Sequence, residues 1–225
     1  MPNPSSSFLS VAPVEASRGT AERTNVTELP LDSLSDAALV AALLHGNQRA
    51  ASVIWRRHSA AVRRMLLRSL GPDQELEDLV QEVFLGFVKS AAKLEDAGML
   101  RSYLVSIAFR TAAMEIRRRK VRRWVRLTPT GTVPEAAIPS TEPDERRALR
   151  ALHGILDTLS TRDRLVFVAR HVEGMQIDEA AAALALSKAT VWRAGKASLE
   201  RVLAEASRTP ALAEYVQRAL RGKEP

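Results

Sequence analysis

The chain has 225 residues, enough for one large or two small domains, and apolar residues make up 46% of them. It contains no cysteine, which excludes disulfides, thiolate metal sites and cysteine nucleophiles. The formal net charge of +7 predicts a negatively charged partner, such as nucleic acid, an acidic protein or a membrane surface.

The first 34 residues carry proline and Ser/Thr clusters without the basic start and apolar run of a signal peptide. Nowhere does an uninterrupted apolar stretch reach the length of about 18 residues that a membrane-spanning helix needs. We therefore expect a disordered tail at residues 1–34 and a cytoplasmic protein without membrane insertion.

Apolar residues at helical spacing predict four helices between residues 35 and 126, and the aromatic content of only 4% also favours helices over sheets. The first helix covers residues 36–44, and the second covers residues 48–70 and ends at Gly71-Pro72. The third covers residues 75–93, and the fourth begins near Met99. The loop between the third and fourth helices, residues 93–98, is long enough to contact a ligand and is not a tight turn.

The predicted third helix has two contrasting faces. One is an apolar stripe expected to face the core, made of Leu76, Leu79, Val80, Val83, Phe84, Phe87 and Val88. The opposite face carries Asp78, Gln81, Glu82 and Leu85. From Asp73 to Val88 there are five acidic residues and no basic one, so this helix predicts a basic partner.

The predicted fourth helix reverses the sign of the charge. Its expected inward residues are Leu100, Tyr103, Leu104, Ile107, Ala108, Thr111 and Met114. Between Arg110 and Arg126 it holds eight Lys or Arg residues against Glu115 alone, which predicts contacts with phosphates.

A second helical domain is predicted at residues 146–204, after a linker at residues 127–145 that contains four prolines. Ser160 is expected to cap a helix that runs through Val172. Residues 178–184, a turn at Ala185-Leu186 and a further helix capped by Ser187 form a helix-turn-helix pattern, in which Val191 should pack against Ala181. Residues 205–225 should form a short extra helix after Thr209-Pro210. The predicted fold class is therefore all-α, with two small helical domains joined by a proline-rich linker.

Signatures of catalysis are missing from the sequence. The four histidines share no metal-ligand spacing, and there is no glycine-rich phosphate loop or nucleophile elbow. We expect no catalytic residue, no metal and no cofactor.

Four segments in this order resemble the extracytoplasmic-function sigma factors, two-domain initiation factors of bacterial transcription. They are GNQRAASVIWRRHSAAVRRMLLRSLG, LEDLVQEVFLGFV, LRSYLVSIAFRTAAMEIRRRKVRR and LSTRDRLVFVARHVEGMQIDEAAAALALSKATV. The resemblance covers roughly residues 35–126 and 146–203, and leaves out the tail, the linker and the last helix.

The resemblance implies three sets of binding residues and no enzymatic role. Core RNA polymerase, through its β′ and β subunits, is the implied first partner, and its β′ subunit would contact Asp78, Gln81, Glu82 and Leu85. Promoter DNA is the second. Its melted minus-ten strand would meet Phe109, Arg110, Arg117 and Lys120. Phe109 would stack on a base, and Tyr103 is a second stacking candidate although it lies on the inward stripe. The major groove of the minus-thirty-five element would meet Ser187, Lys188, Thr190, Trp192, Arg193 and Lys196. An anti-sigma factor is a further implied partner.

Three residues depart from the family pattern. Tyr103 replaces a usual tryptophan, and Ala185 replaces a usual left-handed glycine, at a cost of about 1–2 kcal/mol. Gly195 replaces an apolar residue inside the recognition helix, where glycine costs about 1 kcal/mol relative to alanine. These departures leave two alternatives open: a sigma-like adaptor that binds polymerase or an anti-sigma factor without reading promoters, and a stand-alone helix-turn-helix regulator.

Overall fold

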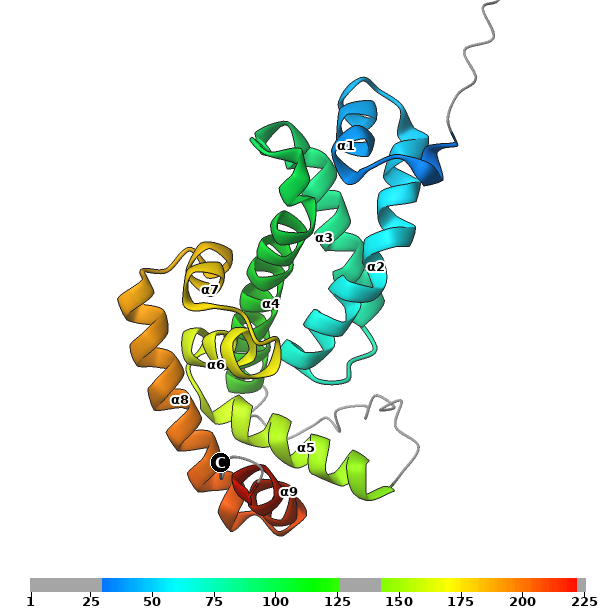
Figure 1. The fold of residues 1–225 in the computed structure, drawn as a ribbon. Helices are drawn as coiled ribbons and strands as arrows, with labels where there is room; N and C mark the ends of the chain where they lie inside the picture. Colours follow the sequence, from blue (N-terminus) through cyan, green and yellow to red (C-terminus); the bar gives the residue numbers. More distant parts are fainter. Residues whose placement is uncertain (1–29, 126–142, 222–225) are drawn as a thin grey trace, which may run out of the picture.

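The computed structural model describes residues 30–125 and 143–221, and within these ranges every regular element is helical (Figure 1). The all-α prediction is therefore confirmed. The elements are η1 (Leu31–Ser33), α1 (Asp36–Leu44), α2 (Gln48–Leu70), α3 (Leu76–Ser90), η2 (Ala91–Lys93), η3 (Ala97–Met99), α4 (Leu100–Val125), α5 (Pro143–Thr158), α6 (Thr161–Phe167), η4 (Val168–Val172), α7 (Ile177–Leu184), α8 (Lys188–Arg208) and α9 (Pro210–Arg221).

Helix ends follow the capping residues of the sequence. The hydroxyl of Ser35 accepts a hydrogen bond from the Ala38 amide at 3.2 Å, and α1 starts there. The hydroxyls of Ser160 and Ser187 do the same for α6 and α8. Gly71 ends α2 with a positive φ of 80° and a ψ of 177°, a conformation that is open to glycine and strained for other residues. The α-helix after Ser160 continues to Val172 as predicted, but its last turn, η4, is a π-helix.

Three predicted boundaries lie elsewhere. The predicted tail, residues 1–34, falls outside the described residues except for its end, where η1 packs on α2 through an ion pair of Asp32 with Arg56. Most of the predicted linker is also outside them, but its last three residues already belong to α5, with Pro143 in the first turn. The helix α8 continues to Arg208, beyond the predicted domain end at residue 204.

The apolar stripe of α3 is buried over most of its length, as expected, by contact with α2 and α4. Leu79, Val80, Val83, Phe84 and Phe87 are buried and Leu76 is partly buried, but Val88 is 47% exposed. A helix turns about 100° per residue, so Val88 lies about 120° around the helix axis from Leu76, at the edge of the stripe. The prediction for Val88 was wrong because α2 presents only the small residues Ala51 and Ser52 beside this edge.

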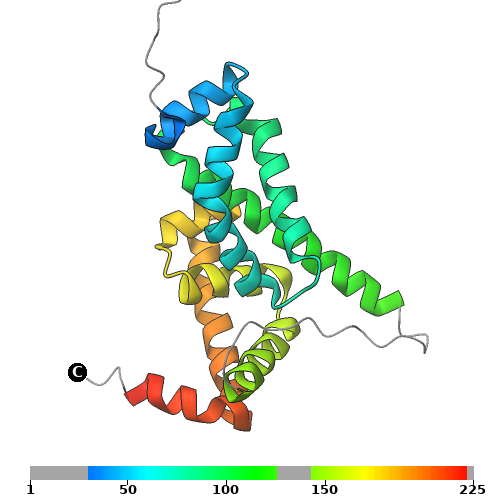
Figure 2. The ribbon, with the colours of Figure 1, turned by 90° about the vertical axis from the view of Figure 1, so that its right-hand side faces the viewer.

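The helices of the two predicted domains pack directly on each other. Figures 1 and 2 show α6 and α7 beside α4, and one core cluster contains residues of α1 to α4 together with Leu165, Val166, Ala181 and Val191. A second, smaller core joins α5, α6, α8 and α9. The two predicted domains therefore share a core in this structure.

Candidate functional site

The first candidate surface is the exposed face of α3. Asp78, Gln81 and Glu82 are exposed, and Leu85 is 60% exposed. None of the four makes a hydrogen bond or ion pair with the described residues, whereas Glu77, on the flank of the helix, pairs with Arg63 at 2.5 Å. Because the opposite stripe of α3 is buried, this face is held outward with two uncompensated carboxylates.

The second candidate surface is the outer side of α4. Arg110 and Arg117 are exposed and have no hydrogen-bond or ion-pair partner among the described residues. Lys120 is also exposed, but its ammonium donates a hydrogen bond to the carbonyl oxygen of Leu159 at 2.9 Å. Two of the three cations assigned to phosphates are thus free, and the third links α4 to the end of α5.

Phe109 lies elsewhere than expected. It is 1% exposed and belongs to the core shared by the two halves, so it cannot stack on a base in this arrangement. The reason is that α4 contacts α2 and α3 on one side and α6 and α7 on another. A residue that points away from the first bundle is therefore still buried. Met114 shows the opposite error, because it was expected inward and is 49% exposed.

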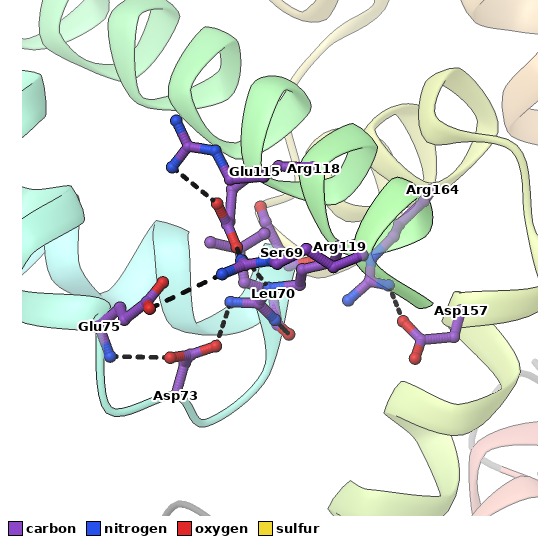
Figure 3. A network of polar contacts seen from close by, with 10 residues as sticks. Ser69, Leu70, Asp73, Glu75, Glu115, Arg118, Arg119, Asp157 and Arg164 are labelled. Carbon is purple, nitrogen blue, oxygen red and sulfur yellow. Dashed lines mark hydrogen bonds and ion pairs between the residues drawn. The ribbon is translucent and has the colours of Figure 1, made fainter. Parts of the chain in front are cut away.

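Several of the arginines on α4 stabilise the fold through ion pairs and hydrogen bonds (Figure 3). The carboxylate of Glu115 is 1% exposed and accepts hydrogen bonds from Arg118, Arg119 and Arg122. Arg119 also donates to the carbonyl oxygen of Leu70 at 3.0 Å and pairs with Asp73 at 2.5 Å. A buried carboxylate needs such compensation, so these arginines are not all available to phosphates.

The third candidate surface is the first half of α8. Lys188, Trp192, Arg193 and Lys196 are exposed, while Val191 is fully buried, with Ala181 in the same core as predicted. The exposed side chains are partly ordered: Lys188 pairs with Asp178 at 2.7 Å, and the Lys196 ammonium lies 5.9 Å from the centre of the Trp192 ring. Ser187 caps the helix and its hydroxyl lies 2.8 Å from that of Thr190, so both hydroxyls already have partners.

The interface between the two halves contains a buried cation that the sequence analysis did not single out. Arg164 of α6 is 3% exposed, donates from Nε to the carbonyl oxygen of Ser69 at 2.7 Å, and pairs with Asp157 (Figure 3). Nearby, Arg68 pairs with Glu173 at 2.9 Å. Sequence offered little signal for Arg164, because its partner is a backbone carbonyl 95 residues away.

His153 lies beside the same interface. Its ring covers Gly71, where a β-carbon would come within 3.2 Å of Cγ, so α2 and α5 meet closely at the glycine. Burial, followed by the nearby charge of Arg164, lowers the pKa of His153 from 6.5 to about 4, while Asp157 opposes the shift. The imidazole is therefore neutral at pH 7, and its Nδ1 has no hydrogen-bond partner among the described residues.

Comparison with known proteins identifies the family of this chain. The sequence matches Sigma-70 region 2 over residues 54–122 and Sigma-70, region 4 over residues 149–202. The RNA polymerase sigma-E factor of Streptomyces coelicolor is 34% identical over 139 residues, which are 61% of this chain and 73% of that protein. The chain belongs to the extracytoplasmic-function sigma factor family.

Further relatives of this sigma factor agree. The RNA polymerase sigma factor CnrH of Cupriavidus metallidurans is 29% identical over 173 residues, covering 72% of this chain and 90% of CnrH. A solved structure of CnrH in complex with the cytosolic domain of CnrY has a TM-score of 0.53 at 25% identity, covering 75% of this chain and 95% of that chain. As a member of the family, the sigma factor directs RNA polymerase to promoters, and such initiation factors are in general not enzymes.

The structure accommodates the three residues that depart from the family pattern, Tyr103, Ala185 and Gly195, without disrupting their helices. The Tyr103 hydroxyl donates to the carbonyl oxygen of Ser90 at 3.2 Å and its ring packs edge-on against Phe87, so this side chain is largely structural. Ala185 adopts the left-handed conformation, with φ of 52° and ψ of 47°. Gly195 is buried, and a β-carbon there would meet Val166, Arg170 and His171 at ordinary contact distances of 3.7–3.8 Å.

Two exposed apolar residues of α4 were not singled out from the sequence. Val121 is 62% exposed and Trp124 is 79% exposed. Spacing could have found them, because the outer side of α4 carries at helical intervals Arg110, Met114, Arg117, Val121 and Trp124. This outer side of the sigma factor therefore offers two free cations together with apolar surface.

Neither a metal site nor a membrane span is found in the described ranges. No group of three or more His, Cys, Asp or Glu residues there could hold a metal ion. No helix in the same ranges is both long and apolar enough to cross a membrane.

Proposed function

We propose that this sigma factor docks on the β′ subunit of core RNA polymerase through the exposed face of α3, formed by Asp78, Gln81, Glu82 and Leu85. The observation that carries the proposal is that all four side chains are exposed and have no hydrogen-bond or ion-pair partner among the residues that the structure describes, on a helix fixed by its buried opposite stripe. Two carboxylates beside an amide and a leucine suit an interface with a basic helix. Contact of the second half with the β subunit is part of the same proposal and is supported by the family alone.

We further propose that α4 and α8 contact the promoter. Arg110 and Arg117 would neutralise phosphates near the minus-ten element, and Lys120 would join them once its bond to Leu159 is released. Lys188, Arg193 and Lys196 would read the minus-thirty-five element from the major groove, with Trp192 beside them. The left-handed turn at Ala185 and the buried Val191 support this reading, because both keep α8 in helix-turn-helix geometry. They weigh against an adaptor that has lost promoter reading.

Regulation by a protein partner is a second proposal. The related CnrH has been solved in complex with the cytosolic domain of CnrY, and its fold is shared by this chain. We infer that an anti-sigma factor likewise binds this sigma factor. A stand-alone helix-turn-helix regulator has less support, because it leaves the free acidic face of α3 without a role.

The docking proposal is tested by charge reversal at the centre of the face. Asp78→Arg leaves the buried stripe intact, and loss of a central interface residue should weaken binding to purified core polymerase at least about 30-fold. Run-off transcription from a pool of genomic fragments should fall in parallel. The matched control is Glu200→Arg, an equal reversal at an exposed position of α8. Wild-type affinity in Asp78→Arg would remove the docking proposal.

A further inference from the structure

A hollow of about 570 Å³ lies between the two halves of the chain, on the side of α4 where α7 packs (Figure 1). Both halves form it, because α2 and the start of α4 line one side, and the end of η4 and α7 line the other. This volume lies within the range of small-molecule sites, about 300–1,000 Å³. Two turns of a helix with their side chains would need about twice as much space. The hollow therefore suits a small ligand rather than a helix.

Methionine is concentrated at this hollow. Three of the five methionines of the chain line it: Met65 of α2, Met99 of η3 and Met175 before α7. Met65 is buried, Met175 is partly buried and Met99 is 53% exposed, so apolar surface continues from the core out to the solvent. Methionine side chains are flexible and polarisable, and surfaces rich in them adapt to apolar ligands of varied shape. The lining therefore offers a place for a flexible apolar chain.

The charged groups at the hollow differ in whether they already have partners. Glu173 forms an ion pair with an arginine of α2 at 2.9 Å, and the Glu179 carboxylate accepts a hydrogen bond from the N-cap amide of α7 at 2.7 Å. Arg64 and Arg101 are exposed and have no hydrogen-bond or ion-pair partner within residues 30–125 and 143–221. Because both carboxylates are engaged and both guanidinium groups are free, the hollow favours an anion.

We propose that this hollow binds a single-chain amphiphile with an anionic head group, a carboxylate or a phosphate, as in a fatty acid anion. The apolar chain lies along the methionines, and Arg64 and Arg101 bind the head group through charge-assisted hydrogen bonds. Because the lining comes from both halves, the ligand also stabilises their packing on each other. The site goes beyond the proposed function, since neither the acidic face of α3 nor the first half of α8 contributes to it.

Calorimetric titration of the full chain with decanoate tests the site. Decanoate should bind, whereas decyltrimethylammonium, which has the same chain length and the opposite charge, should not. A parallel titration with decyl phosphate distinguishes the two head groups. A hundredfold excess of decanoate over its dissociation constant should raise the midpoint of thermal unfolding by at least about 5 °C. The inference is wrong if neither anion binds, or if the cationic amphiphile binds equally well.

Two variants locate the ligand. The double substitution Arg64→Gln and Arg101→Gln removes both cations and should weaken decanoate binding at least about 10-fold. Ala182→Trp fills the hollow from an exposed position of α7 and should also weaken binding at least about 10-fold. The matched controls are Arg49→Gln and Ala204→Trp, at exposed positions of α2 and α8 outside the hollow, which should bind as the wild type does. Circular dichroism checks that each variant is folded, and the arginine variant decides the matter if Ala182→Trp misfolds.

Other occupants of the hollow are tested by a photo-cross-linking amino acid at Ser102, which is exposed and lines it. In the purified full chain it should react only with its neighbours in the hollow. A cross-link to residues 1–29 of this chain or to a second copy would overturn the inference, because protein would then fill the space. Wild-type affinity for decanoate in both the arginine and the tryptophan variants would do the same, since the anion would then bind elsewhere.

Discussion

Gly195 lowers the helix propensity of α8, but its neighbours leave space for only a small side chain at this position. It is buried in α8, and its carbonyl oxygen lies 3.1 Å from Nε2 of His171. Three side chains, from Val166, Arg170 and His171, come within 3.8 Å of the place of a β-carbon. There is thus room for a methyl group but not for a larger side chain.

A pair of substitutions separates helix propensity from packing at this site. Gly195→Ala should raise the free energy of unfolding by about 1 kcal/mol, because alanine is the better helix former. Gly195→Leu should lower it by about 1–3 kcal/mol through overpacking. Thermal unfolding of the full chain measures both, with a shift of about 2–4 °C for each kcal/mol. A stabilised leucine variant would show that α6 and η4 can move away from α8.

At the scale of elements, α4 divides its basic residues between folding and binding. Arg119 and Arg122 compensate the buried Glu115, whereas Arg110 and Arg117 are exposed and have no ion-pair partner within residues 30–125 and 143–221. The sequence shows one run of positive charge and does not distinguish the two groups. The distinction depends on which side of the helix the rest of the chain covers.

Substitutions along α4 should therefore have two different outcomes. Arg117→Ala should weaken holoenzyme binding to a promoter fragment and reduce the slope of log affinity against log salt concentration by about 0.7, the value for one phosphate of a single strand, with unchanged stability. Arg119→Ala should instead lower the free energy of unfolding by about 1–3 kcal/mol, because Glu115 loses part of its compensation. Salt titrations and chemical denaturation of both variants measure the two effects. Equal salt slopes for Arg117→Ala and the wild type would mean that Arg117 does not contact a phosphate.

Helix positions were largely predictable, because they depend on local signals. The start of α1 at Asp36, the end of α2 before Gly71 and the cap of α8 at Ser187 follow from residues adjacent to each helix end. The errors concern residues whose burial depends on distant elements. Phe109 is buried by the packing of the second half on α4, and Val88 is exposed because α2 presents small residues opposite it. Neither the burial of Phe109 nor the exposure of Val88 can be predicted from the apolar periodicity of a single helix.

At the scale of the whole molecule, the two halves are held together by contacts that could not be predicted from the sequence. Arg164 and Lys120 donate to the carbonyl oxygens of Ser69 and Leu159, and any residue supplies such an acceptor. Both donors lie where the two halves meet, and α7 of the helix-turn-helix packs against α4. The surfaces proposed for the minus-ten and minus-thirty-five elements are therefore held in one arrangement by these contacts.

This closed arrangement should weaken in mild acid because of His153. Its pKa is about 4 in the structure and 6.5 when exposed, so below pH 6.5 the open or unfolded chain binds a proton that the closed chain does not. The contribution of His153 to stability is therefore complete above pH 6.5. It falls as the pH drops from 6.5 to 4, by at most about 3 kcal/mol, and changes no further below that.

His153→Phe keeps a ring against Gly71 but cannot be protonated, so its stability should depend less on pH in this window. Urea denaturation of the two full chains between pH 4 and 7, with small-angle scattering to follow separation of the halves, measures the difference. Taking the difference removes the contribution of carboxylates, which titrate in both proteins. Parallel pH profiles for the wild type and His153→Phe would show that His153 stays neutral or leaves the interface without cost.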